Sequence, residues 1–574
     1  MRRVPSSILL LFGACAAAPA NPADPARWPV APATVVDLPP GTPVLAELAP
    51  GLPDEPTWRA AAIWWREALR QSPQLELRET AAGDVDAALC LAVDVRGHTL
   101  TATLRQRGRD HLLAGAAFGD GDLPAAIDRL AFTARTALGE RPAPPVPVAL
   151  ATSARPEVVT AVHDAALLLR DGGATAARRA LREARRADGA APAVLDGLAA
   201  VELLRGDAAA AEALCTEALG YTARLQPTTE HRLARTLLLA RASQRPERAA
   251  DRDRELLALG EAVARERPHD LHGQLTLAIA RNFTGAFAAA RPLLERLRAA
   301  MPDQPIVAYH LGMACLGTGC AAAASAAFDA AALRLPANWV AVPRAIARFE
   351  AGDRDGLAAL LDGLEADALQ NGGPLHDVRR MQAASALLDG RLDAARERLR
   401  TDLQWLAQNP SALDGRSGEF AEQGAVLVRL GGAEDLTPVL AVLQQQAPSA
   451  ALADACAFLA GLAEVTRTRE RATTVEERLG RGGDSAWSAL LAAFAHELRG
   501  EVLAMQTELA RAARLSDAPL TKALLARSLR AVGREPEAAA LQTALRRELR
   551  RIHLRQPLQH PLLGPELAFA FRAD

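Results

Sequence analysis

Hydrophobic and polar positions follow a helical period through most of the chain, from about residue 157 to residue 555. Within this stretch glycines recur at intervals of 33 or 34 residues, as in the step from Gly172 to Gly206. A period of this length is typical of helix pairs that stack as repeats, with a turn inside each pair. Nine glycines fit such a turn: Gly172, Gly206, Gly285, Gly319, Gly352, Gly390, Gly431, Gly500 and Gly533.

Three more columns keep the phase of these glycines. Seven places earlier the residue is always alanine or glycine, and five places later it is mostly alanine. Nine places later it is large and apolar, or a cysteine, in every unit except the one with Gln542. Small residues let two helix axes approach closely, and the larger residue fills the groove beside them. Prolines follow three of the glycines by seventeen places and end the second helix: Pro302, Pro336 and Pro448.

The combined pattern resembles the tetratricopeptide repeat. About eleven units fit into residues 157–555, with irregular stretches near 226–270 and 451–484. The resemblance implies a mainly α fold, a right-handed superhelix of helix pairs. It also implies a concave wall, lined by the first helix of each pair, that receives a peptide or helix of a partner protein.

Five residues in two neighbouring units are candidates for contact with such a partner. The units span residues 271–304 and 305–338, and aromatic and methionine side chains there are suitable anchors. The alternative is that each candidate packs between neighbouring first helices. The sequence lacks the asparagine-and-lysine clamp of family members that bind chaperone tails, so recognition of a peptide carboxylate has no support. The candidates are His272, Asn282, Phe283, Tyr309 and Met313.

Residues 42–140 precede the repeats and alternate between strand and helix patterns. Strands are expected at 44–48, 74–79, 87–95, 99–105 and 111–118, and helices at 57–71 and 123–138. This order predicts a small α/β domain with both helices on one sheet face. On the runs REALRQSPQLELRE, DAALCLAVDVRGHTLTATLRQR and FGDGDLPAAIDRLA, the region resembles the TolB amino-terminal-like domain. Of the adjacent Trp64 and Trp65, one is expected in the core and the other partly exposed.

The segments outside the two domains carry processing and linker features. Residues 1–20 combine two arginines, a short apolar run and small residues, as in a signal peptide. The run LFGAC, ending at Cys15, resembles a lipobox in which that cysteine is lipidated; cleavage after Ala20 is the alternative. Residues 21–41 read as a proline-rich tether, 141–156 as a proline-rich linker and 556–574 as an irregular tail. These features predict an exported, periplasm-facing protein, anchored in the outer membrane as a lipoprotein.

Charge and cysteine usage narrow the class of partner. The formal net charge of −2 gives no overall attraction to nucleic acid, and membrane contact is expected only through the lipid anchor. The arginine-rich stretches 178–186 and 546–555 read as solvated helix faces. Besides Cys15 there are five scattered cysteines, which do not form a disulfide framework, although Cys315 and Cys320 could bridge across a helix end.

No catalytic, cofactor-binding or metal-binding residue is predicted. The run that starts at His496 and Glu497 begins like a zinc-protease motif, but Gly500 stands where the second histidine is needed. We therefore expect a non-enzymatic scaffold or adaptor of the bacterial cell envelope that binds other proteins or peptides. The alternative is a ligand sensor or enzyme with its site in the 42–140 domain, near the tryptophan pair, His98 and His111.

Overall fold

The computed structural model describes residue 36 and residues 38–48, 55–78, 87–94, 98–106, 109–119, 122–143, 145–245, 249–335, 337–371, 375–413, 417–445, 450–467, 486–498, 500–515 and 519–549. The signal peptide with Cys15, most of the tether and the 556–574 tail lie outside this range. The chain forms two compact units. The first ends at Ala314 and also includes Ala330–Leu335; the second consists of Cys315–Asp329 and the residues from Pro336 onward.

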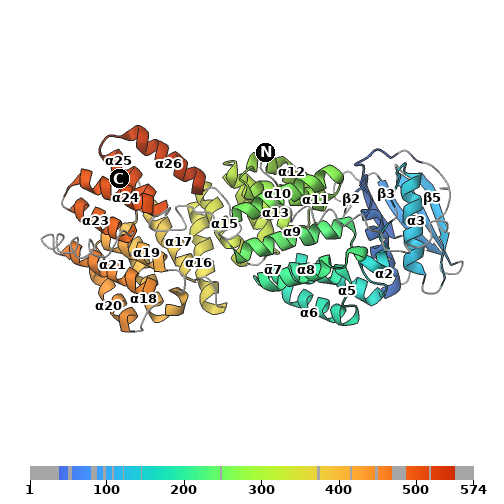
Figure 1. The fold of residues 1–574 in the computed structure, drawn as a ribbon, viewed down its shortest axis with the longest axis horizontal. Helices are drawn as coiled ribbons and strands as arrows, with labels where there is room; N and C mark the ends of the chain where they lie inside the picture. Colours follow the sequence, from blue (N-terminus) through green and yellow to red (C-terminus); the bar gives the residue numbers. More distant parts are fainter. Residues whose placement is uncertain are drawn as a thin grey trace. The chain divides into compact units, whose positions relative to one another are not determined.

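The first unit begins with a five-stranded sheet (Figure 1). The strand order is β2-β1-β3-β4-β5; β1 is parallel to β2 and β3, whereas β3, β4 and β5 are antiparallel. All five strands fall where the alternating pattern predicts them. Their bounds are β1 (Pro43–Leu48), β2 (Glu76–Arg78), β3 (Ala87–Asp94), β4 (Thr99–Gln106) and β5 (Arg109–Ala117).

Two helices, α2 (Pro56–Arg70) and α3 (Leu123–Ala137), cover one face of the sheet, as predicted (Figure 1). They share one apolar core with alternate strand residues such as Leu89, Leu100 and Leu104, which are fully buried. Thr101 and Thr103, which alternate with these core residues along β4, are only partly buried. The domain therefore has two layers, the sheet and the helix pair, and its core lies between them.

The expectation that one of the adjacent tryptophans is partly exposed is wrong, because both are buried. Trp65 enters the sheet core and donates its indole N–H to the Leu89 carbonyl oxygen at 3.1 Å. Trp64 points to the segment before the first repeat and donates to Thr152 Oγ1 and to the Ser153 carbonyl oxygen, both at 3.2 Å. The two side chains point in different directions, as neighbours on a helix must. Trp64 is nevertheless buried, because the segment with Thr152 and Ser153 of the same chain covers it.

The proline-rich segment between the α/β domain and the repeats is packed rather than extended. It contains the short helix α4 (Val148–Ala151), in which Val148 is fully buried. The Val146 amide N–H donates to Gln71 Oε1 at 2.9 Å, and Gln71 Nε2 donates back to the Val146 carbonyl oxygen at 3.0 Å. This segment therefore joins the α/β domain and the repeats into one body.

Most of the remaining described residues lie in helices that form antiparallel pairs; α21 is described without a second helix, and short 3-10 helices occur at Thr222–Arg224 and Pro410–Leu413. In the first unit the paired helices are α5 (Pro156–Arg170), α6 (Ala174–Ala187), α7 (Pro192–Leu204), α8 (Ala208–Leu219), α9 (Pro227–Gln244), α10 (Ala249–Glu266), α11 (Leu271–Phe283) and α12 (Phe287–Ala300). Then come α13 (Pro305–Gly317) and α14 (Ala321–Ala332), which the unit boundary divides. The second unit continues with α15 (Ala337–Glu350), α16 (Arg354–Asn371), α17 (Leu375–Leu388), α18 (Leu392–Gln408), α19 (Ser417–Arg429), α20 (Ala433–Gln445), α21 (Ala450–Arg467), α23 (Ala486–Leu498), α24 (Val502–Leu515), α25 (Pro519–Ala531) and α26 (Glu535–Leu549).

All nine predicted turn glycines have positive φ, from 74° to 85°. Left-handed backbone at a helix end is open to glycine because it lacks a Cβ atom. At Gly206, for example, its N–H bonds to the Leu203 carbonyl oxygen at 3.0 Å, and the Asp207 N–H bonds to the Glu202 carbonyl oxygen at 2.9 Å. The same bond pattern closes the first helix of the other eight pairs. The repeat phase predicted from the sequence is therefore confirmed.

The small and large columns lie inside the helix pairs. In the first column Ala165, Ala199 and Ala278 are fully buried, and in the large column Leu181 and Leu294 are almost so. One close approach lies outside these columns, because a Cβ atom on Gly260 of α10 would lie 2.7 Å from the Leu277 Cα atom of α11. None of the described helices is long and apolar enough to cross a bilayer.

Candidate functional site

The first helices α5, α7, α9 and α11 contact one another in order, and α13 follows them up to Ala314 in the first unit. The repeat pattern leads us to expect a partner on the side that these first helices line. Helix α2 of the α/β domain packs along α5 on this side. Arg59 of α2 pairs with Asp164 of α5 at 2.6 Å, although both side chains remain nearly half exposed. The α/β domain thus covers the beginning of the array.

Arg267, in the turn between α10 of the third helix pair and α11 of the fourth, joins the α/β domain to this part of the solenoid. Its guanidinium is buried and donates to the carbonyl oxygens of Arg70 at 2.5 Å, Gln71 at 3.3 Å and Ser72 at 3.0 Å. These oxygens lie at the C-terminal end of α2, where backbone acceptors lack partners within the helix and the helix dipole favours a cation. Helix α2 is therefore held both at the first pair and at the turn between the third and fourth pairs.

A charged network fills the space beside α2. Burial raises the pKa of Glu67, but the nearby cations Arg70 and Arg232 lower it by more, so the pKa lies below its ordinary value. Arg232 of α9 also pairs with Asp196 of α7 at 2.8 Å, and both side chains are largely buried. The network links α2, α7 and α9, so part of the first-helix side is occupied by the chain's own helix.

A second cluster lies further along the same side, at the end of α11 and the middle of α13. The ring of His310 is buried and contacts Phe283 edge-on, with centroids 5.7 Å apart, and Tyr309 at 5.2 Å. Burial, helped by the positive charge of Arg235, lowers the pKa of His310 to about 3. Burial also raises the pKa of Tyr309 to about 12. This cluster is therefore uncharged near neutral pH, and its residues Phe283 and Tyr309 are each partly exposed.

Comparison with known proteins gives matches among solved structures alone. No family model and no curated protein matches the chain. A tetratricopeptide-repeat protein of Thermus thermophilus is 19 % identical, with 33 % of this chain and 99 % of that chain covered and a TM-score of 0.27. Yeast Tom70 is 14 % identical, covering 68 % of this chain and 90 % of that one, with a TM-score of 0.31. The Cut9–Hcn1 structure is 13 % identical, with 65 % of this chain and 63 % of that chain covered and a TM-score of 0.36.

The fold is a tetratricopeptide-type α-solenoid. This conclusion stands on the repeat within the chain itself, namely its antiparallel helix pairs and its nine glycine turns. The two ring-bearing helices, α11 and α13, are consecutive first helices of the solenoid, so Phe283 and Tyr309 come from neighbouring repeats.

The five candidate contact residues have different environments in the solenoid. Asn282 is fully buried and donates from Nδ2 to the His310 carbonyl oxygen at 2.8 Å, and Met313 is 3 % exposed. For these two the structure supports the packing alternative. Phe283 and Tyr309 are partly exposed and lie together. Their contact with a partner remains a prediction.

His272 lies apart from this cluster, at the start of α11 beside the end of α2. It is partly exposed and lines a hollow of about 30 Å³ together with Ser72, Leu77 and Thr228. That volume holds about one water molecule. His272 therefore lines only a small space, and its contact with a partner stays a prediction.

His310 is the member of the cluster that sequence reasoning did not assign to the wall. Its sequence neighbour Tyr309 was a candidate, and its position 28 residues after Asn282 places the two side chains on adjacent first helices. Cys315 and Cys320, the pair considered for a bridge, are not joined by a disulfide in this structure. In the α/β domain, His98 has φ of 48° and its ring contacts Phe118 at 5.5 Å, while His111 is partly exposed on β5.

Proposed function

We propose that this chain is a non-enzymatic scaffold or adaptor of the bacterial cell envelope. It binds a peptide or helix of a partner protein on the first-helix side of the solenoid. Stacked helix pairs support this proposal, because they offer a long wall whose side chains come from successive repeats. Helix α2 occupies the beginning of that wall, so the partner binds beyond it.

The observation that carries the proposal is the aromatic cluster on α11 and α13. Phe283 and Tyr309 are partly exposed, and both contact the buried His310 ring, which fixes their orientation. Rigid aromatic side chains bury a large area at low cost in conformational entropy, which is why they often dominate binding energy at interfaces. A partner that contributes an apolar side chain here would cover both rings at once.

Crosslinking in the native host, followed by mass spectrometry, tests the proposal. We expect one or more proteins crosslinked to the full chain, and at least a fivefold loss of that product in the double variant Phe283→Ala/Tyr309→Ala. The matched control is Leu168→Ala/Leu333→Ala, which removes two exposed apolar side chains of the same unit. No crosslinked protein, or an equal loss in both double variants, would contradict the proposal.

We further propose that the chain is exported and held at the outer membrane through a lipid on Cys15. The support is the sequence of residues 1–20 with the run LFGAC. Metabolic labelling with a lipid analogue tests it, because Cys15→Ser should lose the label while the scaffold function of a soluble form is retained. Equal labelling of the unchanged chain and the variant would show that Cys15 is not the anchor.

A further inference from the structure

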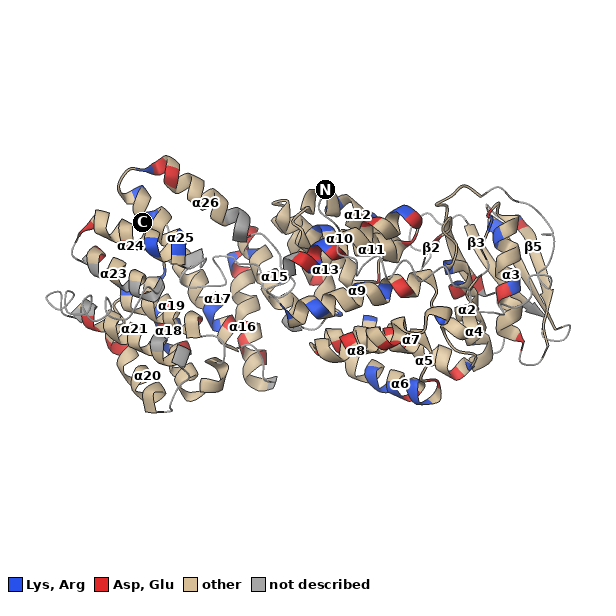
Figure 2. Cartoon of the chain, viewed as in Figure 1, with Lys and Arg blue, Asp and Glu red and all other residues tan. Residues whose placement is uncertain are grey.

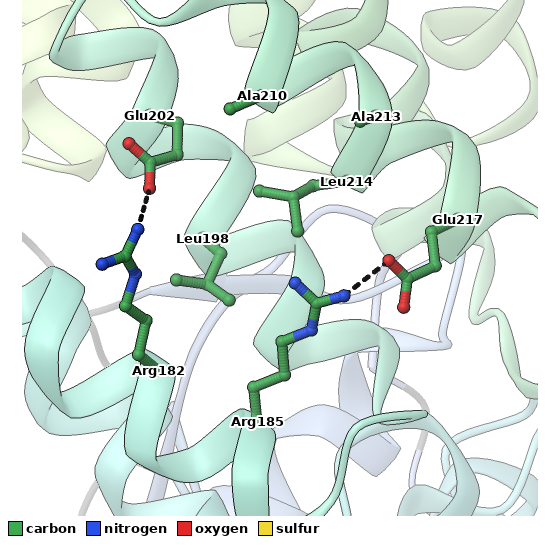
Figure 3. Close-up of a pocket in the computed structure, with 8 residues that line it drawn as sticks. All are labelled: Arg182, Arg185, Leu198, Glu202, Ala210, Ala213, Leu214 and Glu217. Carbon is green, nitrogen blue, oxygen red and sulfur yellow. Dashed lines mark hydrogen bonds and ion pairs between the residues drawn. The ribbon is translucent and has the colours of Figure 1, made fainter.

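An open hollow of about 280 Å³ lies among α6, α7 and α8 of the first unit (Figure 3). Arg182 and Arg185 of α6 extend along one wall, and Leu198 of α7 and Leu214 of α8 form an apolar floor. Both leucines are more than nine-tenths buried, yet each borders the hollow. The volume is open because the facing positions on α8 are alanines, including Ala213.

The hollow is lined by two arginines and two glutamates, and the excess of positive charge lies on helix α6 beside it. Helix α6 carries five arginines and one glutamate, which appear as a row of basic positions in Figure 2. The largely buried Glu202 accepts a hydrogen bond from Arg178 at 2.6 Å and forms a longer ion pair with Arg182 at 3.7 Å (Figure 3). Arg182 is also 55 % exposed, so its guanidinium donors face solvent.

The second arginine retains donors as well. Arg185 Nη2 pairs with Glu217 at 2.8 Å, and the Arg185 side chain is 41 % exposed. A guanidinium has five N–H donors, and one contact to Glu217 leaves most of them available. Two arginines that project over an apolar floor therefore match a ligand that combines a carboxylate with an aliphatic group.

We propose that this hollow binds an acidic segment of a partner protein, with a carboxylate on Arg182 and Arg185 and a neighbouring aliphatic side chain on Leu198 and Leu214. The proposal rests on the scaffold function only in taking the occupant to be a protein. An anionic bilayer fits less well, because the site is concave and Glu217 stands at its rim, whereas a membrane surface is broad and attracts an evenly basic face.

Fluorescence anisotropy with a labelled hexapeptide of alternating leucine and glutamate tests the proposal on the full chain. We expect saturable binding, at least tenfold weaker binding of the leucine–glutamine hexapeptide, and severalfold weaker binding when salt rises from about 50 to about 300 mM. The variant Arg182→Ala/Arg185→Ala should lose at least tenfold in affinity. The control Arg291→Ala/Arg298→Ala, which makes the same change of charge on α12, should keep it.

A variant that fills the hollow without changing its charge distinguishes binding in the hollow from general electrostatic attraction to the basic helix. Ala213→Phe fills the space at an exposed position, so it should fold normally and bind the acidic peptide at least fivefold more weakly. Equal binding to the unchanged chain and to both hollow variants would overturn the proposal. So would preferential binding of phosphatidylglycerol vesicles that the arginine variant abolishes. If the full chain binds no acidic peptide but still crosslinks to its native partner, the proposal for the hollow is wrong and the proposed scaffold function is unaffected.

Discussion

Arg267 donates a hydrogen bond from its guanidinium to the Ser72 carbonyl oxygen at 3.0 Å, across 195 positions of sequence. The same group contacts the carbonyl oxygens of Arg70 and Gln71, so one side chain from the turn between the third and fourth helix pairs closes the C-terminal end of α2. Burial lowers the pKa of Arg267, because removal from water disfavours the charged guanidinium. The contact positions the α/β domain against the solenoid.

Loss of this contact should destabilise the first unit. Arg267→Ala leaves three backbone carbonyl groups without their charged donor, and we expect a loss of about 2–4 kcal/mol in the free energy of unfolding. Urea unfolding measures it, and hydrogen exchange should rise in α2 and around residue 72. Arg265→Ala, at an exposed position near the end of α10, should change stability by less than about 0.5 kcal/mol. Similar effects of both variants would contradict the assigned role.

A methyl group on Gly260 should separate α10 from α11. Its Cβ atom would lie 2.7 Å from the Leu277 Cα atom, and a backbone atom cannot move aside as the end of a side chain can. We expect Gly260→Ala to cost about 1–3 kcal/mol, the usual range for overpacking. Gly363→Ala, in α16 with open space around its Cβ position, should instead be neutral or stabilise by about 0.5–1 kcal/mol. Thermal unfolding of the two variants distinguishes these outcomes.

Asp128 should make the unchanged chain less stable as the pH rises. This α3 residue accepts the Val148 N–H at 3.0 Å, and burial raises its pKa to about 7 from an ordinary value of 3.8. Between these two values the folded state holds a proton that the unfolded state has lost, so stability falls with rising pH. Asp128→Asn retains an acceptor without a charge and should be about 2–4 kcal/mol more stable at pH 8.

The same variant should differ little from the unchanged chain at pH 4, where the carboxyl group is largely protonated in the folded state. Urea unfolding at both pH values checks this, with the exposed Asp171→Asn as the control. Parallel stability curves for Asp128→Asn and the unchanged chain between pH 4 and pH 8 would show that Asp128 is not protonated in the fold.

His310 should have the opposite effect of pH. Its folded pKa of about 3 lies below the ordinary value of 6.5, so below pH 6.5 the unfolded state binds a proton that the folded state excludes. This one group then removes about 1.4 kcal/mol of stability for each pH unit between 6.5 and the folded pKa. His310→Gln should show a shallower loss of stability from pH 7 to pH 4.5. An unchanged slope, equal to that of His111→Gln, would refute this.

Much of the fold follows from local pattern. A turn such as that at Gly206 requires a left-handed residue, and the alanines at fixed distances from it allow the paired helices to pack closely. These requirements act within about twenty residues, so they leave a visible period in the chain. The strands of the α/β domain are likewise predictable, because alternate residues such as Leu89 and Leu91 are buried on one sheet face.

The candidate site was predictable only in part. The helical period places Phe283 and Tyr309 on first helices, and both are partly exposed there. The same period places Asn282 and Met313 on those helices, but neighbouring helices cover them. Exposure depends on which elements surround a helix, and the period of a single helix does not contain that information.

Helix pairing and repeat phase were therefore set by short-range interactions, which the amino-acid sequence alone reveals. The placement of α2 against the solenoid, the burial of Trp64 and the capping of that helix by Arg267 were decided by contacts between residues about 90 to 200 positions apart. Such contacts have no period, because each joins two surfaces whose shapes exist only after the separate parts have folded.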